Sequence, residues 1–178
     1  MAVGGDPYAH ACLGVMYEYG CCVDQSYSTA VECYRKAAEQ GYSRGQHNLG
    51  WMYQNGYGVD QSYSTAVEWY RKAAEQGNAI AQFNLGWMYQ NGYGVDKNNS
   101  TAVEWYRKAA EQGHADAQIS LGVMYEFGWG VNKDYNASAE WYRKVAEQGD
   151  SDAQTRLDNM TKQLSKKKKW RGLKFFSE

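Results

Sequence analysis

The chain has 178 residues, of which 43% are hydrophobic and 15% aromatic, with seven Trp and sixteen Tyr. This composition excludes a disordered chain and predicts one domain with a packed, aromatic-rich interior. Residues 162–178 hold seven bases and one acid, so this end carries +6 and residues 1–161 carry −7. The acidic main part is therefore not expected to be a nucleic-acid surface.

Neither a membrane span nor a secretory signal is apparent. No apolar run approaches the length of a span, and the opening residues MAVGGDPYAH lack both the basic start and the apolar stretch of a signal. We therefore expect a cytoplasmic location by default.

A 36-residue repeat organises the chain. Residues 41–76 and 77–112 agree at 28 of 36 positions, and the same frame extends to residues 5–40 and 113–148. A fifth copy opens at Gly149 and breaks up after Leu157. A period of this length is typical of stacked units that are each too small to bury an apolar face alone.

Each repeat is predicted to begin with a helix, called helix A. Helix A contains a Leu-Gly pair followed by Tyr, as in Leu49, Gly50 and Tyr53. Glycine inside a helix costs about 1 kcal/mol relative to Ala, so its repetition predicts a close contact between helices. The helices are expected to follow Asp6, Tyr42, Asn78, His114 and Asp150, with Pro7 at the first helical position, and four of them to stop at Gly20, Gly56, Gly92 and Gly128.

A loop of the form Gly-aromatic-Gly-Val leads to the second helix of each repeat, called helix B. Ala66, Tyr70 and Ala73 have helical spacings of four and three, which predicts one buried stripe. The N-cap candidates are Ser26, Ser62, Asn98 and Asp134, and left-handed C′ glycines are expected at Gly41, Gly77, Gly113 and Gly149.

The last segment departs from the repeat. Ala153, Leu157, Met160 and Leu164 form a helical stripe, which predicts a capping helix over residues 150–164 that closes a domain of residues 1–164. Residues 165–178 form a basic, aromatic tail that includes Lys166, Lys167, Lys168, Lys169, Trp170 and Arg171. Such a tail is typical of a nuclear-import signal, an anionic-membrane anchor, a docking peptide or a disordered solubilising end.

The segments AQFNLGWMYQNGYGVD (81–96) and AVEWYRKAAEQG (102–113) resemble the motif of Sel1-like repeats, which are relatives of tetratricopeptide repeats. The resemblance covers residues 5 to about 158. It implies an all-α fold, a right-handed α-solenoid of about four helix-turn-helix repeats with a C-terminal capping helix. It also implies a non-enzymatic scaffold or adaptor whose helix A residues line a concave surface that binds a partner protein or peptide.

The concave positions implied by this resemblance are rich in aromatic and amide side chains. In the second to fourth repeats they are Arg44, His47, Trp51, Gln54, Asn55, Ile80, Phe83, Trp87, Gln90, Asn91, Asp116, Ile119, Val123, Glu126 and Phe127, and in the first they are Tyr8, Ala11, Val15, Glu18 and Tyr19. Aromatic rings offer contact area and amides bond a peptide backbone, so this mixture suits peptide recognition. In a second interpretation Trp51 and Trp87 fill space between repeats.

No pattern indicates catalysis, a cofactor or a metal site. The three His lie in different repeats, and the four Cys, all in the first repeat, lack metal-ligand spacing. Cys12 and Cys33 stand at similar heights on one helical hairpin, where a disulfide is geometrically feasible. We expect free thiols instead, in keeping with a reducing compartment.

Three alternatives stay open at this stage. The Lys166–Lys169 tail favours a regulatory module that delivers a partner to a membrane or the nucleus. A hydrolase, of the kind proposed for cysteine-rich relatives, lacks a nucleophile and base at workable spacing. Self-association is the third, because arrays with exposed aromatic residues at one end stack head to tail.

Overall fold

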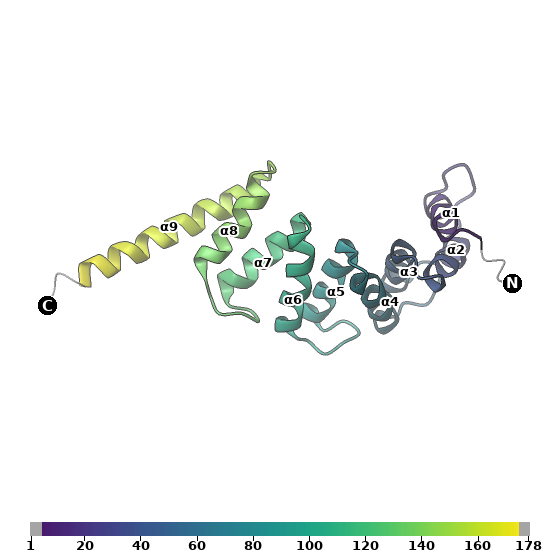
Figure 1. Cartoon of the computed structure of the whole chain (residues 1–178), viewed down its shortest axis with the longest axis horizontal. Coiled ribbons are helices and arrows are strands. Elements are labelled where there is room, and N and C mark those ends of the chain that lie inside the picture. The colour runs from purple at the N-terminus through teal and green to yellow at the C-terminus, as the bar shows by residue number, and fades with distance from the viewer. Residues whose placement is uncertain (1–4, 175–178) are drawn as a thin grey trace. The chain divides into compact units, whose positions relative to one another are not determined.

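The computed structural model describes residues 5–174, and the side chains of residues 5–166. The described residues form α-helices joined by loops, without a strand, which confirms the predicted all-α class (Figure 1). The helices are α1 (Pro7–Tyr19), α2 (Tyr27–Glu39), α3 (Ser43–Asn55), α4 (Tyr63–Glu75), α5 (Ala79–Asn91), α6 (Asn99–Glu111), α7 (Ala115–Phe127), α8 (Tyr135–Ala146) and α9 (Ser151–Lys174).

The chain divides into two compact units, with the boundary after Asn98. In the first unit α1 packs on α2 and α3, α3 packs on α4, and α4 packs on α5. In the second unit α7 packs on α6 and α8, and α8 packs on α9. Within each unit, helices that follow one another in the chain pack together, as stacked helix-turn-helix repeats require.

Helix ends follow the predicted cap residues. The Asp6 and Asn78 side chains accept hydrogen bonds from backbone N–H groups of the first turns of α1 and α5. Ser26 and Ser62 do the same for α2 and α4, while Tyr42 makes no such bond. The glycines expected in left-handed backbone all have φ between +84° and +94°: Gly41, Gly77, Gly113 and Gly149.

The helix A glycine makes room for the helix B tyrosine. A Cβ on Gly14 would lie 2.5 Å from the Tyr34 ring, and a Cβ on Gly50 would lie 2.9 Å from the Tyr70 ring. Both rings are fully buried. The predicted close contact between the two helices of a repeat is therefore a contact between a glycine and an aromatic ring.

The inter-helix loop fits closely over the preceding repeat. Gly58 has φ +69°, and a Cβ there would lie 2.4 Å from the backbone carbonyl carbon of Tyr27. The neighbouring Tyr57 stacks on the Tyr27 ring at 4.9 Å. Cys22 occupies the equivalent position in the first repeat with φ 65°, and α2 is the first helix B of the described residues.

Arginines of helix B also join successive repeats. Arg35 donates to the Tyr53 hydroxyl at 3.2 Å, and Arg71 donates to the Tyr89 hydroxyl at 2.8 Å. In the second unit Arg107 donates to Tyr125 at 2.9 Å. The exposed arginines of helix B therefore contribute polar contacts between repeats.

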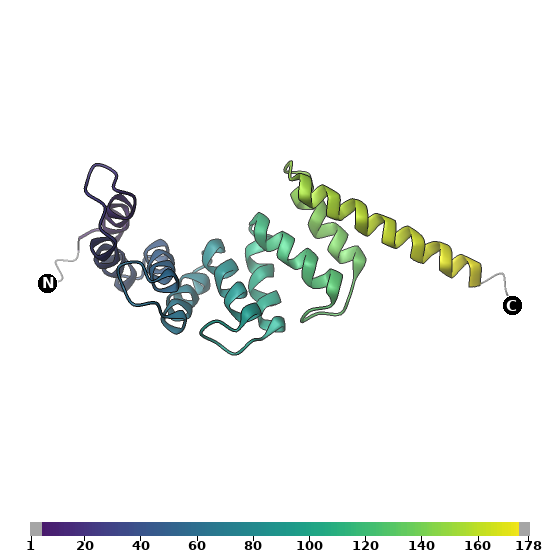
Figure 2. The ribbon, with the colours of Figure 1, turned by 180° about the vertical axis from the view of Figure 1, so that it is seen from behind.

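The last helix is longer than the predicted capping helix. Ala153, Leu157 and Met160 are buried, and the helix packs on α8 before continuing to Lys174 (Figure 2). Lys has a high helix propensity, so the lysine run propagates the helix. The side chains of Lys167 to Arg171 lie outside the described residues, and the division between domain and tail stays a prediction.

We expect Gly58→Ala to destabilise the protein far more than Gly77→Ala. Both glycines have left-handed backbone, which costs an Ala about 1 to 2 kcal/mol. A Cβ on Gly77 meets nothing within 4 Å, whereas one on Gly58 collides with backbone and adds about 2 kcal/mol. Urea denaturation of both variants measures the difference, and equal unfolding free energies would contradict the close loop contact.

Candidate functional site

The predicted concave residues lie on α1, α3 and α5 in the first unit and on α7 in the second. On α1, Tyr8 and Tyr19 are exposed, Val15 is partly buried, and Ala11 and Glu18 are buried. Arg44, Asn55, Ile80 and Asn91 are exposed, and in the second unit so are Asp116 and Phe127. The others, His47, Trp51, Gln54, Phe83, Trp87, Gln90, Ile119, Val123 and Glu126, are partly buried.

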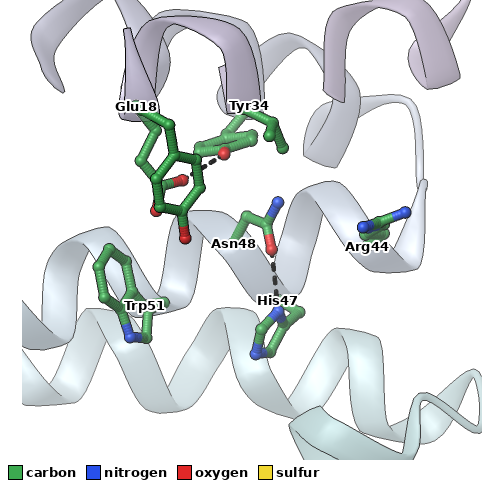
Figure 3. A pocket seen from close by; sticks show the side chains of 8 residues that line it. Glu18, Tyr34, Arg44, His47, Asn48 and Trp51 are labelled. Atoms are coloured by element: carbon green, nitrogen blue, oxygen red, sulfur yellow. Dashed lines mark hydrogen bonds between the residues drawn. The ribbon is translucent and has the colours of Figure 1, made fainter. Parts of the chain in front are cut away.

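A pocket of about 300 Å³ lies between α1 and α3 in the first unit (Figure 3). It is lined by Val15, Glu18, Tyr19, Tyr34, Arg44, His47, Asn48 and Trp51. Six of these residues are predicted concave positions, which the structure brings together around one pocket. Tyr34 and Asn48 are not among them. The Tyr34 ring belongs to the predicted buried stripe, but its hydroxyl reaches the pocket.

Small side chains on α1 leave space for the pocket between α1 and α3. Trp51 and Trp87 occupy one repeat position where the first repeat has Val15 and the fourth has Val123. His47 and Phe83 occupy another, where the first repeat has Ala11. A second cavity, of about 150 Å³, adjoins the pocket and shares Val15 and Arg44 with it.

Glu18 is the acidic group of the pocket. Its side chain is only 7% exposed, and its carboxylate accepts a hydrogen bond from the Tyr34 hydroxyl. Burial, and then this bond, raise the pKa of Tyr34 above its usual range. Glu18 also raises the pKa of the exposed Tyr19. Both tyrosines therefore face the carboxylate as neutral hydroxyl groups.

The bond between a helix A acceptor and the helix B tyrosine recurs along the chain. Tyr70 donates to Gln54 Oε1 at 2.8 Å in the second repeat. Tyr142 donates to Glu126 at 2.9 Å in the fourth, and burial followed by this bond raises the pKa of Tyr142 to about 12. Gln54 and Glu126, both predicted to contact a partner, thus also satisfy a buried hydroxyl.

His47 is held between its neighbours. Its Nδ1 lies 3.0 Å from Asn48 Oδ1, and its Nε2 lies 3.2 Å from Asn84 Nδ2 on α5. A ring with Nδ1–H as donor and Nε2 as acceptor satisfies both contacts. Burial lowers the pKa of His47, so the imidazole is neutral at physiological pH. The charged side chains that line the pocket are therefore Glu18 and Arg44.

The two proposed tryptophans pack on loop tyrosines. Trp51 lies 5.1 Å from Tyr57, and Trp87 lies 5.0 Å from Tyr93, between ring centroids. Trp51 also lines the pocket. The rings therefore fill space between elements, as the second interpretation expects, and Trp51 additionally presents part of its surface to the cavity.

The asparagines that end these helices have partners within the chain. Asn55 Nδ2 donates to the Trp51 carbonyl at 2.8 Å, and Asn91 Nδ2 donates to the Trp87 carbonyl at 2.9 Å. Each side chain keeps its carbonyl oxygen as an acceptor for another group.

The cysteines and the potential metal-ligating side chains that the structure describes do not form a second candidate site. All four cysteines are free, with Cys33 buried and the other three exposed. Among the described side chains, no group of three or more His, Cys, Asp or Glu is arranged to hold a metal ion. Over the same part of the chain, every helix is too short or too polar to cross a membrane.

Comparison with known proteins gives consistent matches. The Sel1 repeat family model matches residues 7–42, 43–78, 79–114 and 115–150. A protective antigen of uropathogenic Escherichia coli strains, which displays an SLR fold, is 45% identical with a TM-score of 0.87, over 89% of this chain and 34% of that one. No curated protein matches the chain.

Two further solved structures are similar. A Sel1 repeat protein from Oxalobacter formigenes is 41% identical with a TM-score of 0.82, over 86% of this chain and 63% of that one. Cysteine rich protein B of Helicobacter pylori is 28% identical with a TM-score of 0.52, over 65% of this chain and 95% of that one. The chain thus spans about a third of the Escherichia coli antigen and under two thirds of the Oxalobacter formigenes protein.

We expect Tyr142→Phe to flatten the alkaline loss of stability. An unfolded Tyr loses its proton near pH 10, whereas folded Tyr142 holds it to about pH 12. Its contribution is therefore complete below pH 10 and is lost as the pH rises toward 12. Urea denaturation across this range should show a slope smaller by about 1.4 kcal/mol per pH unit in the variant. Equal slopes would contradict the assignment.

Proposed function

The chain belongs to the Sel1 repeat family, and from this premise we propose that it is a non-enzymatic scaffold that binds a peptide segment of a partner protein on the helix A face of its first unit. Sel1 repeat proteins are commonly protein-interaction scaffolds, and the family is generally non-enzymatic. The identity of the segment and the residues that contact it are the new elements of the proposal.

The observation that carries the proposal is the pocket between α1 and α3. It combines aromatic walls with converging polar groups, which is the usual make-up of a recognition site. Trp51 is already held by its contact with Tyr57, so little side-chain freedom is lost when a ligand binds. The exposed Ile80 and Asn91 on α5 extend the proposed surface.

The second unit contributes its own proposed contacts on α7. Phe127 is 52% exposed and stacks on Trp129 at 5.1 Å between ring centroids. Asp116 is exposed, and Ile119 and Glu126 are partly buried. We assign these residues to partner contacts separate from those of the first unit.

We expect a random displayed peptide library, selected on the immobilised full chain, to yield peptides whose binding depends on Trp51 and Trp87. Each Ala substitution should weaken a selected peptide by about tenfold or more, because buried aromatic residues supply most of the energy of such contacts. Isothermal titration calorimetry measures the affinities.

Trp69→Ala is the matched control, since Trp69 is a partly buried tryptophan on helix B that also packs on the core. Circular dichroism melts establish that all three variants fold. Selected peptides that bind the tryptophan variants as tightly as the unchanged chain would refute the proposed face.

A second candidate function rests on the +6 charge of residues 162–178. A basic segment of this kind binds anionic membrane surfaces, with about 1 kcal/mol from each Lys near the surface. We expect the chain to sediment with vesicles that contain phosphatidylserine, and substitution of Lys166–Lys169 by Gln to release it. Vesicles of phosphatidylcholine alone are the control, and failure of the unchanged chain to sediment would remove this candidate.

A further inference from the structure

We propose that the pocket between α1 and α3 binds a basic side chain, lysine or arginine, of the bound peptide, with the Glu18 carboxylate as its counter-charge. This inference rests on the proposed function and adds the class of residue that the site selects. It follows from the position of Glu18, from the walls of the pocket and from a comparison with the fourth repeat.

Glu18 is a buried carboxylate whose described donors are neutral. The Tyr34 hydroxyl donates to it, and the Tyr19 hydroxyl lies close enough for the carboxylate to raise its pKa. A buried charge is costly unless an opposite charge accompanies it. A cation that enters the pocket would supply that charge.

In the fourth repeat a cation of the chain itself lies near the corresponding tyrosine. There the acceptor is Glu126, and the Arg156 guanidinium of α9 lies 5.8 Å from the centroid of the Tyr142 ring that bonds it. Arg156 offsets part of the rise in the Tyr142 pKa that burial and Glu126 cause. An acidic acceptor in this unit is thus accompanied by a cation from the next helix.

The same two positions can be compared through every repeat. The acceptor position holds Glu18, Gln54, Gln90 and Glu126 in the four repeats, and the residues 30 positions later are Asn48, Asn84, Ser120 and Arg156. In the second and third repeats both positions are neutral. In the fourth, the acid Glu126 is followed 30 residues later by the cation Arg156, whereas in the first the acid Glu18 is followed by the neutral Asn48. The first repeat therefore has the carboxylate of the fourth without its cation.

The walls of the pocket suit a long basic side chain. Val15, Trp51 and Tyr34 line it, so an aliphatic stem can pack on apolar surface while its charged end approaches Glu18. Aromatic faces also attract ammonium and guanidinium groups. A volume of about 300 Å³ accommodates such a side chain.

Arg44 does not take this role. Figure 3 shows it at the end of the pocket opposite Glu18, and its side chain is exposed, so water and salt screen its charge. His47 is neutral and adds no positive charge. The −7 charge of residues 1–161 also favours a basic partner over an acidic one.

The experiment compares the selected peptides with versions in which each Lys or Arg is replaced by norleucine. Calorimetry on the unchanged full chain should show that one such replacement weakens binding about tenfold or more. In Glu18→Gln the Lys and norleucine peptides should bind equally. Gln is compatible with the fold, because Gln54 accepts from Tyr70 in the second repeat. Glu32→Gln, an exposed acid on α2, is the charge-matched control that should keep the preference.

Asn48→Arg provides an independent variant. This substitution gives position 48 the arginine that the equivalent position, Arg156, already has. The new guanidinium should occupy the pocket beside Glu18, so the preference for basic peptides should be lost. The preference surviving in Glu18→Gln or in Asn48→Arg would overturn the inference.

A small probe separates this inference from the proposed function. We expect Nα-acetyl-lysine methylamide, and not the norleucine analogue, to shift the Trp51 indole N–H signal in NMR spectra of the full chain, and Glu18→Gln to abolish the shift. Peptides that need Trp51 but show no basic preference would refute the inference and leave the proposed function intact. If the lysine probe binds but no peptide is selected, the proposed function is refuted and the basic preference of the pocket stands. No response to either probe or peptide would refute both.

Discussion

The contact between the helix A glycine and the helix B tyrosine is the interaction on which the repeats depend. Because Gly50 has no side chain, the Tyr70 ring lies directly against α3 and is fully buried. The ring brings its hydroxyl to Gln54, four residues later on α3. One glycine therefore sets both the distance between two helices and the place where a polar group must be supplied. In the first repeat that polar group is Glu18, at the pocket.

Much of the fold could be predicted because its determinants are local. The cap residues, the left-handed glycines and the buried stripe of Ala66, Tyr70 and Ala73 are all visible in the spacing of residue types. The conformation of these residues depends on neighbours within one or two helical turns. The end of α9 is less predictable, since the lysine run has no stop signal and the helix continues through it.

The site could be predicted only in part, because the pocket lies where the side chains of α1 are small. Repeat alignment identifies Arg44, His47 and Trp51, and the structure places them at one pocket. The space for the pocket is left by the small Ala11 and Val15, which shows only when the first repeat is compared with the second and third. The Tyr34 hydroxyl escapes sequence reasoning for another reason. A buried tyrosine in a helical stripe signals packing, and only the fold shows where its polar end lies.

The first repeat departs from the second and third in two ways. Cys22 stands where the later repeats have a glycine, such as Gly58, that admits the preceding helix B. Ala11 and Val15 stand where the second repeat has His47 and Trp51, although α3 packs on α1. Filling that space would bury more apolar surface and stabilise the repeat. The unfilled space beside a buried carboxylate therefore fits the basic side chain that we propose for the pocket.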